Sequence, residues 1–372
     1  MNKCIGILTA GGDSPGINAA IRSVGRALER ENIHLLGFRD GFEGIAFDKC
    51  EYLNQNTYSG ILTKGGTILG TSRNKPHKMP VGKKIIDMTD AIVDTYKRRQ
   101  LEGLICIGGG GTHKSALRLL EQGLNVITMP KTIDNDLAGT DNSIGYDTAI
   151  QIATNAIDSL HSTASSHKRI IILEVMGHRA GWLTLASGVA GGADVIMIPE
   201  IPYDLEKVAE AITRRSRQGK RFSIVPVAEG AMPVAMAKRY HELLQKKDQA
   251  SSRGDRDKVK AELDQLWQEH TGHSMRIARE LETLTGLESR VTILGHLQRG
   301  GFPSAADRLL ATRLGVVCAE NIFKGNYGKM MSVQGENIVP VAIDSVAGRV
   351  KYVPLDDLLV KAARDTDTCL GD

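Results

Sequence analysis

The chain has 372 residues, 41% of them hydrophobic and 24% charged, and a formal net charge of +4. This composition is ordinary for a globular protein, the length suffices for two domains, and the small charge argues against nucleic-acid binding. The five cysteines are scattered without a C-x-x-C pair, so neither a disulfide framework nor a zinc site is predicted. Without a recognisable signal peptide or an apolar run approaching ~18 residues, we expect a cytoplasmic protein with no membrane segment.

The first predicted strand, Cys4–Leu8, runs into a turn with the sequence GGDSPG at residues 11–16, and a helical pattern begins at Ile17. Glycines at a strand-to-helix turn let backbone N–H groups approach phosphate oxygens, and the helix N-terminus adds positive potential. The turn is neither a G-x-G-x-x-G loop nor a Walker loop, which disfavours both of those classes. Taken alone, it is equally compatible with an ordinary turn capped by Asp13 or Ser14.

A second strand, Leu104–Ile107, leads into four consecutive glycines at residues 108–111 and then into another helical pattern. Four glycines in a row are costly in chain entropy, and a purely structural turn would need only one or two. The run therefore favours a contact between the backbone and a phosphate group.

The next strand, Val126–Met129, is ended by Pro130 and followed by the loop Lys131–Asp136, which has the sequence KTIDND. Carboxylates, a hydroxyl and an ammonium group thus lie at the carboxyl end of a strand, where open α/β sheets bind ligands. Asp134 and Asp136 can have different tasks, one accepting a proton and the other holding a metal. The alternative is a turn-forming Asp/Asn cluster, which the two upstream glycine loops make less attractive.

Three further strands, Ile170–Leu173, Phe222–Val225 and Val291–Leu294, are each followed by charged or imidazole side chains. Together they favour a binding cleft for an anionic sugar over three unrelated loops. Between them, residues 236–270 are rich in charge, carry apolar residues at helical spacing and have a break at 251–255. This segment predicts an inserted helical hairpin, and a solvated insertion is favoured over a subunit contact.

In its four motifs GGDSPG, TIDND, EVMG and GHLQRGG, the chain resembles bacterial-type 6-phosphofructokinases from Ile5 to about Arg313. The resemblance implies an α/β fold of two Rossmann-like domains with mainly parallel sheets and helices on both faces, as the alternation of strands and helices also indicates. The expected phosphoryl-donor domain comprises residues 1–145 and 298–350. The expected fructose 6-phosphate domain comprises residues 146–297 and 351–372, with the helical insertion at about 236–270.

The resemblance implies phosphoryl transfer from ATP to the 1-hydroxyl of fructose 6-phosphate in glycolysis, giving fructose 1,6-bisphosphate, with Mg²⁺ as cofactor. By the same resemblance, Asp134 is the general base, and Thr132, Gly12 and Arg73 complete the catalytic set. The implied donor-binding residues are Gly11, Gly12, Arg73, Gly109, Gly110, Gly111, Thr112 and Lys131. The implied substrate-binding residues are Thr132, Asp134, Asp136, Arg169, Met176, Gly177, His178, Arg179, Glu229, Arg290, His296 and Arg299. Of these, Arg169 and Arg290 match arginines that reach the site from a neighbouring subunit, so we expect a homotetramer, or at least a homodimer.

The chain departs from the family's pattern, or combines its markers, in several places. Gly110 replaces a carboxylate that helps to hold magnesium, which leaves Asp136 and the donor phosphates as the expected ligands. Gly111 favours ATP, because an Asp there goes with pyrophosphate, whereas Lys131 matches the lysine of pyrophosphate users. His178-Arg179 stands where many members have Arg first, so the sugar-phosphate contact is made either by His178 or by Arg179.

Several functions therefore remain open from the sequence. The main interpretation is an ATP-dependent phosphofructokinase. The alternatives are a pyrophosphate-dependent enzyme and a weakly active, sugar-phosphate-binding subunit of the same type. A nicotinamide dehydrogenase is disfavoured, because no acidic residue closes a strand ~20 residues after a G-x-G-x-x-G loop.

Overall fold

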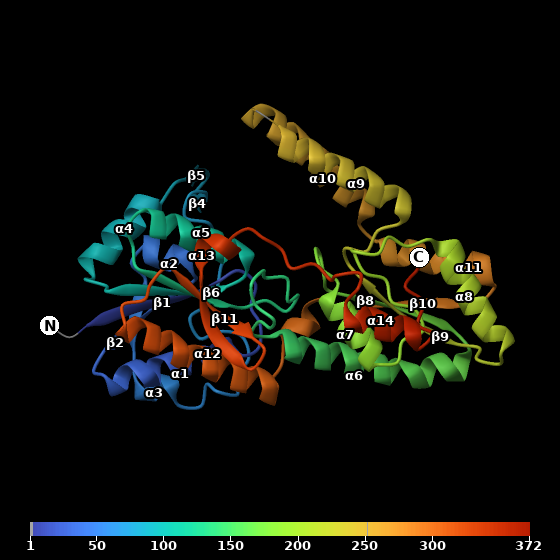
Figure 1. The fold of residues 1–372 in the computed structure, drawn as a ribbon, viewed down its shortest axis with the longest axis horizontal. Helices are drawn as coiled ribbons and strands as arrows, with labels where there is room; N and C mark the ends of the chain where they lie inside the picture. The colour runs from blue at the N-terminus through green and yellow to red at the C-terminus, as the bar shows by residue number, and fades with distance from the viewer. Residues whose placement is uncertain (1–2, 251) are drawn as a thin grey trace. The chain divides into compact units, whose positions relative to one another are not determined.

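The computed structural model describes residues 3–250 and 252–372, so the expected break at 251–255 falls partly outside the described residues (Figure 1). The chain divides into two compact units. Unit 1 comprises the described residues up to Gln151 together with His296–Lys351, and unit 2 comprises Ile152–Gly295 and Tyr352–Asp372. Each unit has its own sheet and its own hydrophobic core.

Unit 1 is built on a seven-stranded sheet with the strand order β12-β11-β7-β6-β1-β2-β3. The pairs that join β2, β1, β6, β7 and β11 are parallel, whereas the two edge strands β3 and β12 pair antiparallel. Pro130, expected to stop the strand before it, is itself the last residue of β7 and lies opposite Gly108. The strands are β1 (Cys4–Ala10), β2 (His34–Phe38), β3 (Cys50–Leu53), β6 (Gly103–Gly108), β7 (Val126–Pro130), β11 (Lys329–Gln334) and β12 (Asn337–Ala342).

Helices cover both faces of this sheet (Figure 1). In β6, Ile105 and Ile107 belong to the core under α1 (Ile17–Arg30) and α12 (Ala305–Phe323). Leu104 and Cys106 belong to the opposite core, under α2 (Phe42–Ala46), α4 (Thr89–Arg98) and α5 (Gly110–Glu121). Because successive side chains of a strand point to opposite faces, a continuous apolar strand needs helices on both sides. The predicted α/β class, with a mainly parallel sheet and helices on both faces, is confirmed. The remaining elements of unit 1 are short: α3 (Gln55–Tyr58), β4 (Met79–Val81), β5 (Lys84–Ile86) and α13 (Ile343–Val346).

Unit 2 contains a three-stranded parallel sheet with the order β10-β8-β9. Its strands are β8 (Ile170–Val175), β9 (Ser223–Ala228) and β10 (Ser289–Ile293). One face packs against α8 (Leu205–Arg217) and α11 (His273–Thr285), and a second apolar cluster joins α7 (Trp182–Ala190) to α14 (Leu358–Asp365). The long helix α6 (Tyr146–His167) begins in unit 1 and continues into unit 2.

The segment around 236–270 forms two helices, α9 (Val234–Gln249) and α10 (Arg253–His270), which lie side by side in unit 2 (Figure 1). They share a small core of their own, made by Leu243, Leu263 and Leu266. The helix α10 begins with a side-chain cap, because Ser252 Oγ accepts a hydrogen bond from the N–H of Asp255 at 3.0 Å. Among the described helices, none is at once long enough and apolar enough to span a bilayer.

Candidate active site

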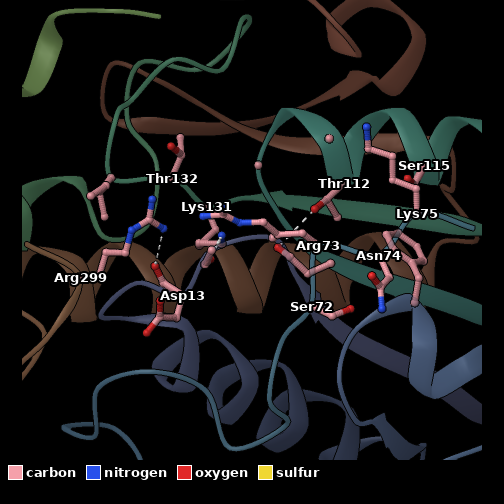
Figure 2. A pocket seen from close by; sticks show the side chains of 17 residues that line it. Asp13, Ser72, Arg73, Asn74, Lys75, Thr112, Ser115, Lys131, Thr132 and Arg299 are labelled. Atoms are coloured by element: carbon pink, nitrogen blue, oxygen red, sulfur yellow. Dashed lines mark hydrogen bonds between the residues drawn. The ribbon is translucent and has the colours of Figure 1, made fainter. Parts of the chain in front are cut away.

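A cavity of about 290 Å³ lies in unit 1 at the carboxyl ends of β1, β6 and β7 (Figure 2). In a parallel sheet these strand ends meet at one edge, which is where the sequence places its glycine and aspartate loops. Seven of the eight predicted donor-binding residues line the cavity, and Gly110 is the exception. The lining residues are Ala10, Gly11, Gly12, Asp13, Phe42, Ser72, Arg73, Asn74, Lys75, Gly109, Gly111, Thr112, Ser115, Lys131, Thr132, Ile133 and Arg299.

The turn after β1 is fastened to the segment that carries Arg73. Gly11 has a φ of +90°, a conformation that favours glycine. Its N–H donates to the carbonyl of Ser72 at 2.9 Å, and Thr71 Oγ1 donates to the Gly11 carbonyl at 2.8 Å. These bonds place the Arg73 side chain beside the glycine turn, inside the cavity (Figure 2).

The four-glycine run has distinct parts. A Cβ on Gly108 would lie 2.1 Å from Thr112 Oγ1 and 2.7 Å from the Ala10 carbonyl oxygen, so this position needs glycine. Gly109 is the N-cap of α5, and Gly110 and Gly111 form its first turn with no positive φ. The first N–H groups of a helix have no partner within the helix, so the start of α5 suits an anion.

Gly110 and Gly111 both have room for a side chain. A Cβ on Gly110 would meet Leu137 Cδ2 at 3.7 Å, an ordinary contact, and a Cβ on Gly111 would meet none of the described atoms within 4 Å. Packing within this chain therefore does not require glycine at either position. Open space at Gly111, on the wall of the cavity, is compatible with a bulky donor.

Lys131 is a buried cation, with 3% of its surface exposed, and its Nζ donates to the carbonyl of Gly12. Burial, with a smaller effect of the nearby Arg299 guanidinium, lowers the pKa of Lys131 to about 8. Arg299 Nη1 in turn donates to the Asp13 carbonyl at 3.4 Å. Figure 2 shows the Arg299, Lys131 and Arg73 side chains along this one cavity, a cationic lining that suits a polyphosphate.

The aspartate loop after β7 is held by its own hydrogen bonds. The N–H of Asp134 donates to Thr132 Oγ1 at 3.1 Å, and Ser143 Oγ donates to the Thr132 carbonyl at 2.6 Å. Asn135, with a φ of 51°, donates from its side chain to the carbonyl of Asp141 at 2.9 Å. Thr132 lines the cavity, whereas Asp134 and Asp136 are half-buried immediately beyond it.

Asp136 is fixed through its backbone, because its carbonyl accepts a hydrogen bond from the N–H of Lys351 at 2.9 Å. Among the described residues, no cluster of three His, Cys, Asp or Glu side chains could hold a metal unaided. One or two carboxylates beside a phosphate-binding cavity nevertheless fit Mg²⁺, which binds through few protein ligands together with substrate phosphates and water.

In unit 2, a second group of predicted residues gathers at the carboxyl ends of β8 and β9. The N–H of Glu229 donates to the carbonyl of Val175 at 2.9 Å, and the N–H of Gly230 donates to the carbonyl of Gly177 at 3.1 Å. Gly177 has a φ of 144°, which favours glycine. The loop with Met176, Gly177, His178 and Arg179 therefore lies beside the loop with Glu229, and His178 and Arg179 are exposed.

Arg169 and Arg290 are not part of that group. Arg169 precedes β8 and Met176 follows it, so the six residues of the strand separate them by about 20 Å. Both arginines pair instead with Glu288, with Arg169 Nε 2.5 Å from Glu288 Oε2. The hydrogen bond from Arg169 is the main reason that the pKa of Glu288 is lowered. Within one chain, these two arginines lie at the amino ends of the strands, whereas Met176 and Gly177 follow the carboxyl end of β8.

Sequence reasoning missed Ser72, Lys75 and Ser115 as lining residues. Ser115 had a usable signal, since it lies four residues after Gly111 and therefore on the same face of α5. Ser72 and Lys75 lie in a segment without regular structure, whose path no periodicity indicates. His296 and Arg299 both fall in the 3₁₀ helix Gly295–Arg299, but of these two only Arg299 lines the cavity.

Comparison with known proteins decides the family. The phosphofructokinase family model matches residues 4–322. The chain belongs to the phosphofructokinase family. A relative from Propionibacterium freudenreichii subsp. shermanii, named ATP-dependent 6-phosphofructokinase, is 50% identical over 100% of both chains. One from Spirochaeta thermophila with the same name is 44% identical over 100% of this chain and 98% of its own. The resemblance seen in the sequence is thus confirmed.

Solved phosphofructokinase structures have the same fold. The chain aligns with Pichia pastoris phosphofructokinase in the T-state with a TM-score of 0.78 and 28% identity, over 99% of this chain and 37% of that longer one. A pyrophosphate-dependent phosphofructokinase from Nitrosospira multiformis aligns with a TM-score of 0.79 over 100% of this chain and 93% of its own. At 18% identity, that second match speaks for the fold alone.

Proposed function

We propose that this phosphofructokinase transfers the terminal phosphoryl group of ATP to the 1-hydroxyl of fructose 6-phosphate. The observation that carries the proposal is the cavity of unit 1, where the start of α5 meets Arg73, Lys131 and Arg299. Catalysis of phosphoryl transfer rests on positioning the reactants and on neutralising negative charge that is spread over the phosphoryl oxygens. Backbone N–H groups and cations around one cavity can do both.

ATP is the donor that we favour over pyrophosphate. Gly111 adds no side chain to the cavity wall, and the space around its Cβ position is open among the described residues. The relatives at 50% and 44% identity are both named ATP-dependent enzymes, which supports the same choice. Lys131 then serves as a cation toward the donor phosphates and does not select pyrophosphate.

Asp134 is the proposed general base. Its carboxylate accepts the proton of the sugar's 1-hydroxyl as that oxygen bonds to phosphorus, while the bond from phosphorus to the ADP oxygen breaks. Thr132 Oγ1, which accepts a hydrogen bond from the Asp134 N–H, fixes the backbone of the base at the cavity edge. The N–H group of Gly12 and the Arg73 guanidinium, which both belong to residues lining the cavity, are proposed to neutralise charge on the donor.

A magnesium ion would be held by Asp136 and by the donor phosphates. When bound, it supplies a Lewis acid that neutralises phosphate charge. Gly110, at the start of α5, contributes no carboxylate, so the chain offers fewer hard oxygen ligands than the family's usual pattern.

The proposed sugar site is completed by a neighbouring subunit. The carboxyl ends of the unit 2 strands carry Met176, Gly177, His178 and Glu229. The amino ends of the strands carry Arg169 and Arg290. Those two arginines can then bind the sugar phosphate in the site of a neighbouring subunit. The active form would therefore be at least a dimer, and we favour a homotetramer with dihedral symmetry.

The test is an activity matrix with the purified full-length chain. ATP or pyrophosphate is offered with fructose 6-phosphate while magnesium is titrated, and product is followed in a coupled assay. We expect turnover with ATP that depends on magnesium and far less with pyrophosphate. Higher kcat/KM with pyrophosphate would overturn the choice of donor. Binding of fructose 6-phosphate without turnover on either donor would identify a sugar-phosphate-binding subunit instead.

A further inference from the structure

Trp267, near the end of α10 in the inserted hairpin, contacts the loop that follows β8. Its indole ring lies against the imidazole of His178, with ring centroids 4.2 Å apart and planes inclined by 35°. His178 directly follows Gly177 in the loop proposed to bind the sugar. A helix that the fold inserts between β9 and α11 thus reaches a residue of the substrate loop, far away in the sequence.

The indole is itself held from two sides. Tyr240 of α9 packs edge-on against it with centroids 5.8 Å apart, and His270 of α10 does so at 5.6 Å. The neighbouring Leu266 is buried in the hairpin's own core, which fixes the rotation of α10 about its axis. The hairpin therefore presents Trp267 in one defined orientation.

The base of the hairpin is anchored to the sheet. His270 and His273 stack with centroids 4.2 Å apart and planes 16° apart, and burial lowers the pKa of His270 to about 3 and also lowers the pKa of His273. Arg276 Nη1 donates to the Glu269 carbonyl at the end of α10 at 2.7 Å. Ser274 Oγ donates to Glu174 Oε2 on β8 at 2.5 Å, so the corner after α10 is bonded to the strand that precedes the His178 loop.

His178 and Arg179 also border a cavity of about 360 Å³ in unit 2, together with Trp267, Tyr240 and Tyr352. Stacking uses the face of an imidazole, whereas hydrogen bonding uses the nitrogens at its edge. The indole contact is therefore compatible with a ligand at His178.

We propose that Trp267 is a positioning residue for substrate: by stacking on His178, it holds the imidazole in the orientation that contacts the phosphorylated sugar. This inference rests on the proposed function. Many members of the family have an arginine at the position of His178, and an arginine side chain carries a fork of hydrogen-bond donors on a long stem. An imidazole is shorter and offers one nitrogen per direction, so its contact depends more on a fixed ring orientation.

The test compares substitutions of Trp267 by steady-state kinetics and by calorimetric binding of fructose 6-phosphate. Trp267→Ala removes the ring that packs on the His178 imidazole, and the loss of this fixed orientation should raise KM and Kd for fructose 6-phosphate by about 3- to 10-fold. The kcat and the KM for ATP should stay within about twofold, since neither depends on that contact. Trp267→Phe keeps a ring face and should restore most of the affinity. Gln268→Ala, its exposed neighbour on α10, is the matched control and should change nothing.

If Trp267 only stabilised the fold, its replacement would not affect fructose 6-phosphate more than ATP. If Trp267→Ala is too unstable to assay, Trp267→Leu keeps apolar bulk without the ring face and should show the same rise in KM. Combined with His178→Ala, either variant should add little further loss, because both act through one imidazole. Fully additive losses, an unchanged KM for the sugar, or an equal loss toward ATP would overturn the inference while leaving the proposed function standing. A wild type that neither binds nor phosphorylates fructose 6-phosphate would overturn both.

Discussion

Replacing Gly111 by Asp is expected to impair the use of ATP through charge. Gly111 lies in the first turn of α5 on the wall of the cavity, is exposed, and has no described atom within 4 Å of its Cβ position. An Asp there fits without a clash, and an acidic residue at the start of a helix stabilises it. The substitution should therefore leave the fold intact and add a negative charge beside bound phosphates.

The size of the effect follows from the exposure of the site. Two like charges about 4 Å apart repel by about 1 kcal/mol in bulk water and by about 4 kcal/mol near a protein surface. Because Gly111 is exposed on one side and faces the cavity on the other, we take the repulsion between the Asp carboxylate and the donor phosphate as about 2–3 kcal/mol. This corresponds to a loss of about 30- to 150-fold in kcat/KM for ATP.

Gly111→Asn is the matched control, since it has nearly the same shape without the charge. Initial rates are measured for the wild type and both variants with ATP and with pyrophosphate, and melting temperatures are compared. We expect Gly111→Asn to retain most of the ATP activity, and pyrophosphate, which has no nucleoside, to be affected less than ATP by Gly111→Asp. Equal losses for Asp and Asn would show that bulk and not charge is at work. No loss in either variant would refute the placement of the donor phosphates beside α5.

Four further outcomes are expected. Asp134→Asn keeps the shape of the base without its basicity, so kcat should fall on the order of 10² or more while KM for fructose 6-phosphate changes little; near-normal turnover would remove Asp134 as base. Gly110→Asp, which has room for its Cβ, should lower the magnesium concentration that gives half-maximal rate at an unchanged melting temperature; a folded variant with no such gain would show that this position cannot reach the metal. Because the pKa of Lys131 is lowered to about 8, its charge is lost as pH rises through that value, so kcat/KM for ATP should fall above about pH 8 and Lys131→Arg should delay the fall; a flat profile up to pH 9.5, about 1.5 pH units above that pKa, would contradict this role. Mixed refolding of Asp134→Asn with Arg290→Ala chains should recover activity that neither variant has alone, because a mixed assembly contains some sites with both native residues; no recovery in assemblies shown to be mixed would argue that each subunit completes its own site.

The donor cavity was largely predictable because its residues follow buried strands directly. Each glycine loop comes after a short apolar strand, and the carboxyl ends of parallel strands lie along one side of the sheet. That Gly11, Gly109 and Thr132 belong to one site was implied by the family resemblance. What the pattern could not show is the reach of individual side chains. Lys131 bends back to the carbonyl of Gly12, a contact that depends on rotamers and burial and not on spacing.

Contacts made by irregular or inserted segments were outside the reach of sequence reasoning. Lys75 enters the cavity from a stretch without periodicity. Trp267 sits at helical spacing and looks like a core residue of the hairpin, yet its ring contacts His178 on a different element. The room for a side chain at Gly110 and Gly111 agrees with the carboxylates that the resemblance implies at these positions in other members, whereas the crowding at Gly108 could be found only from the structure.

The most direct measurement of the central claim is phosphorus NMR of the reaction itself. The purified chain is mixed with ATP, magnesium and fructose 6-phosphate, and the phosphorus signals are followed over time. The account predicts loss of the γ-phosphate signal of ATP matched by equal growth of ADP and of a second phosphate ester on carbon 1 of the sugar, with no reaction in Asp134→Asn on the same timescale. Release of inorganic phosphate in place of the sugar ester, or a sugar ester formed only when pyrophosphate replaces ATP, would contradict it.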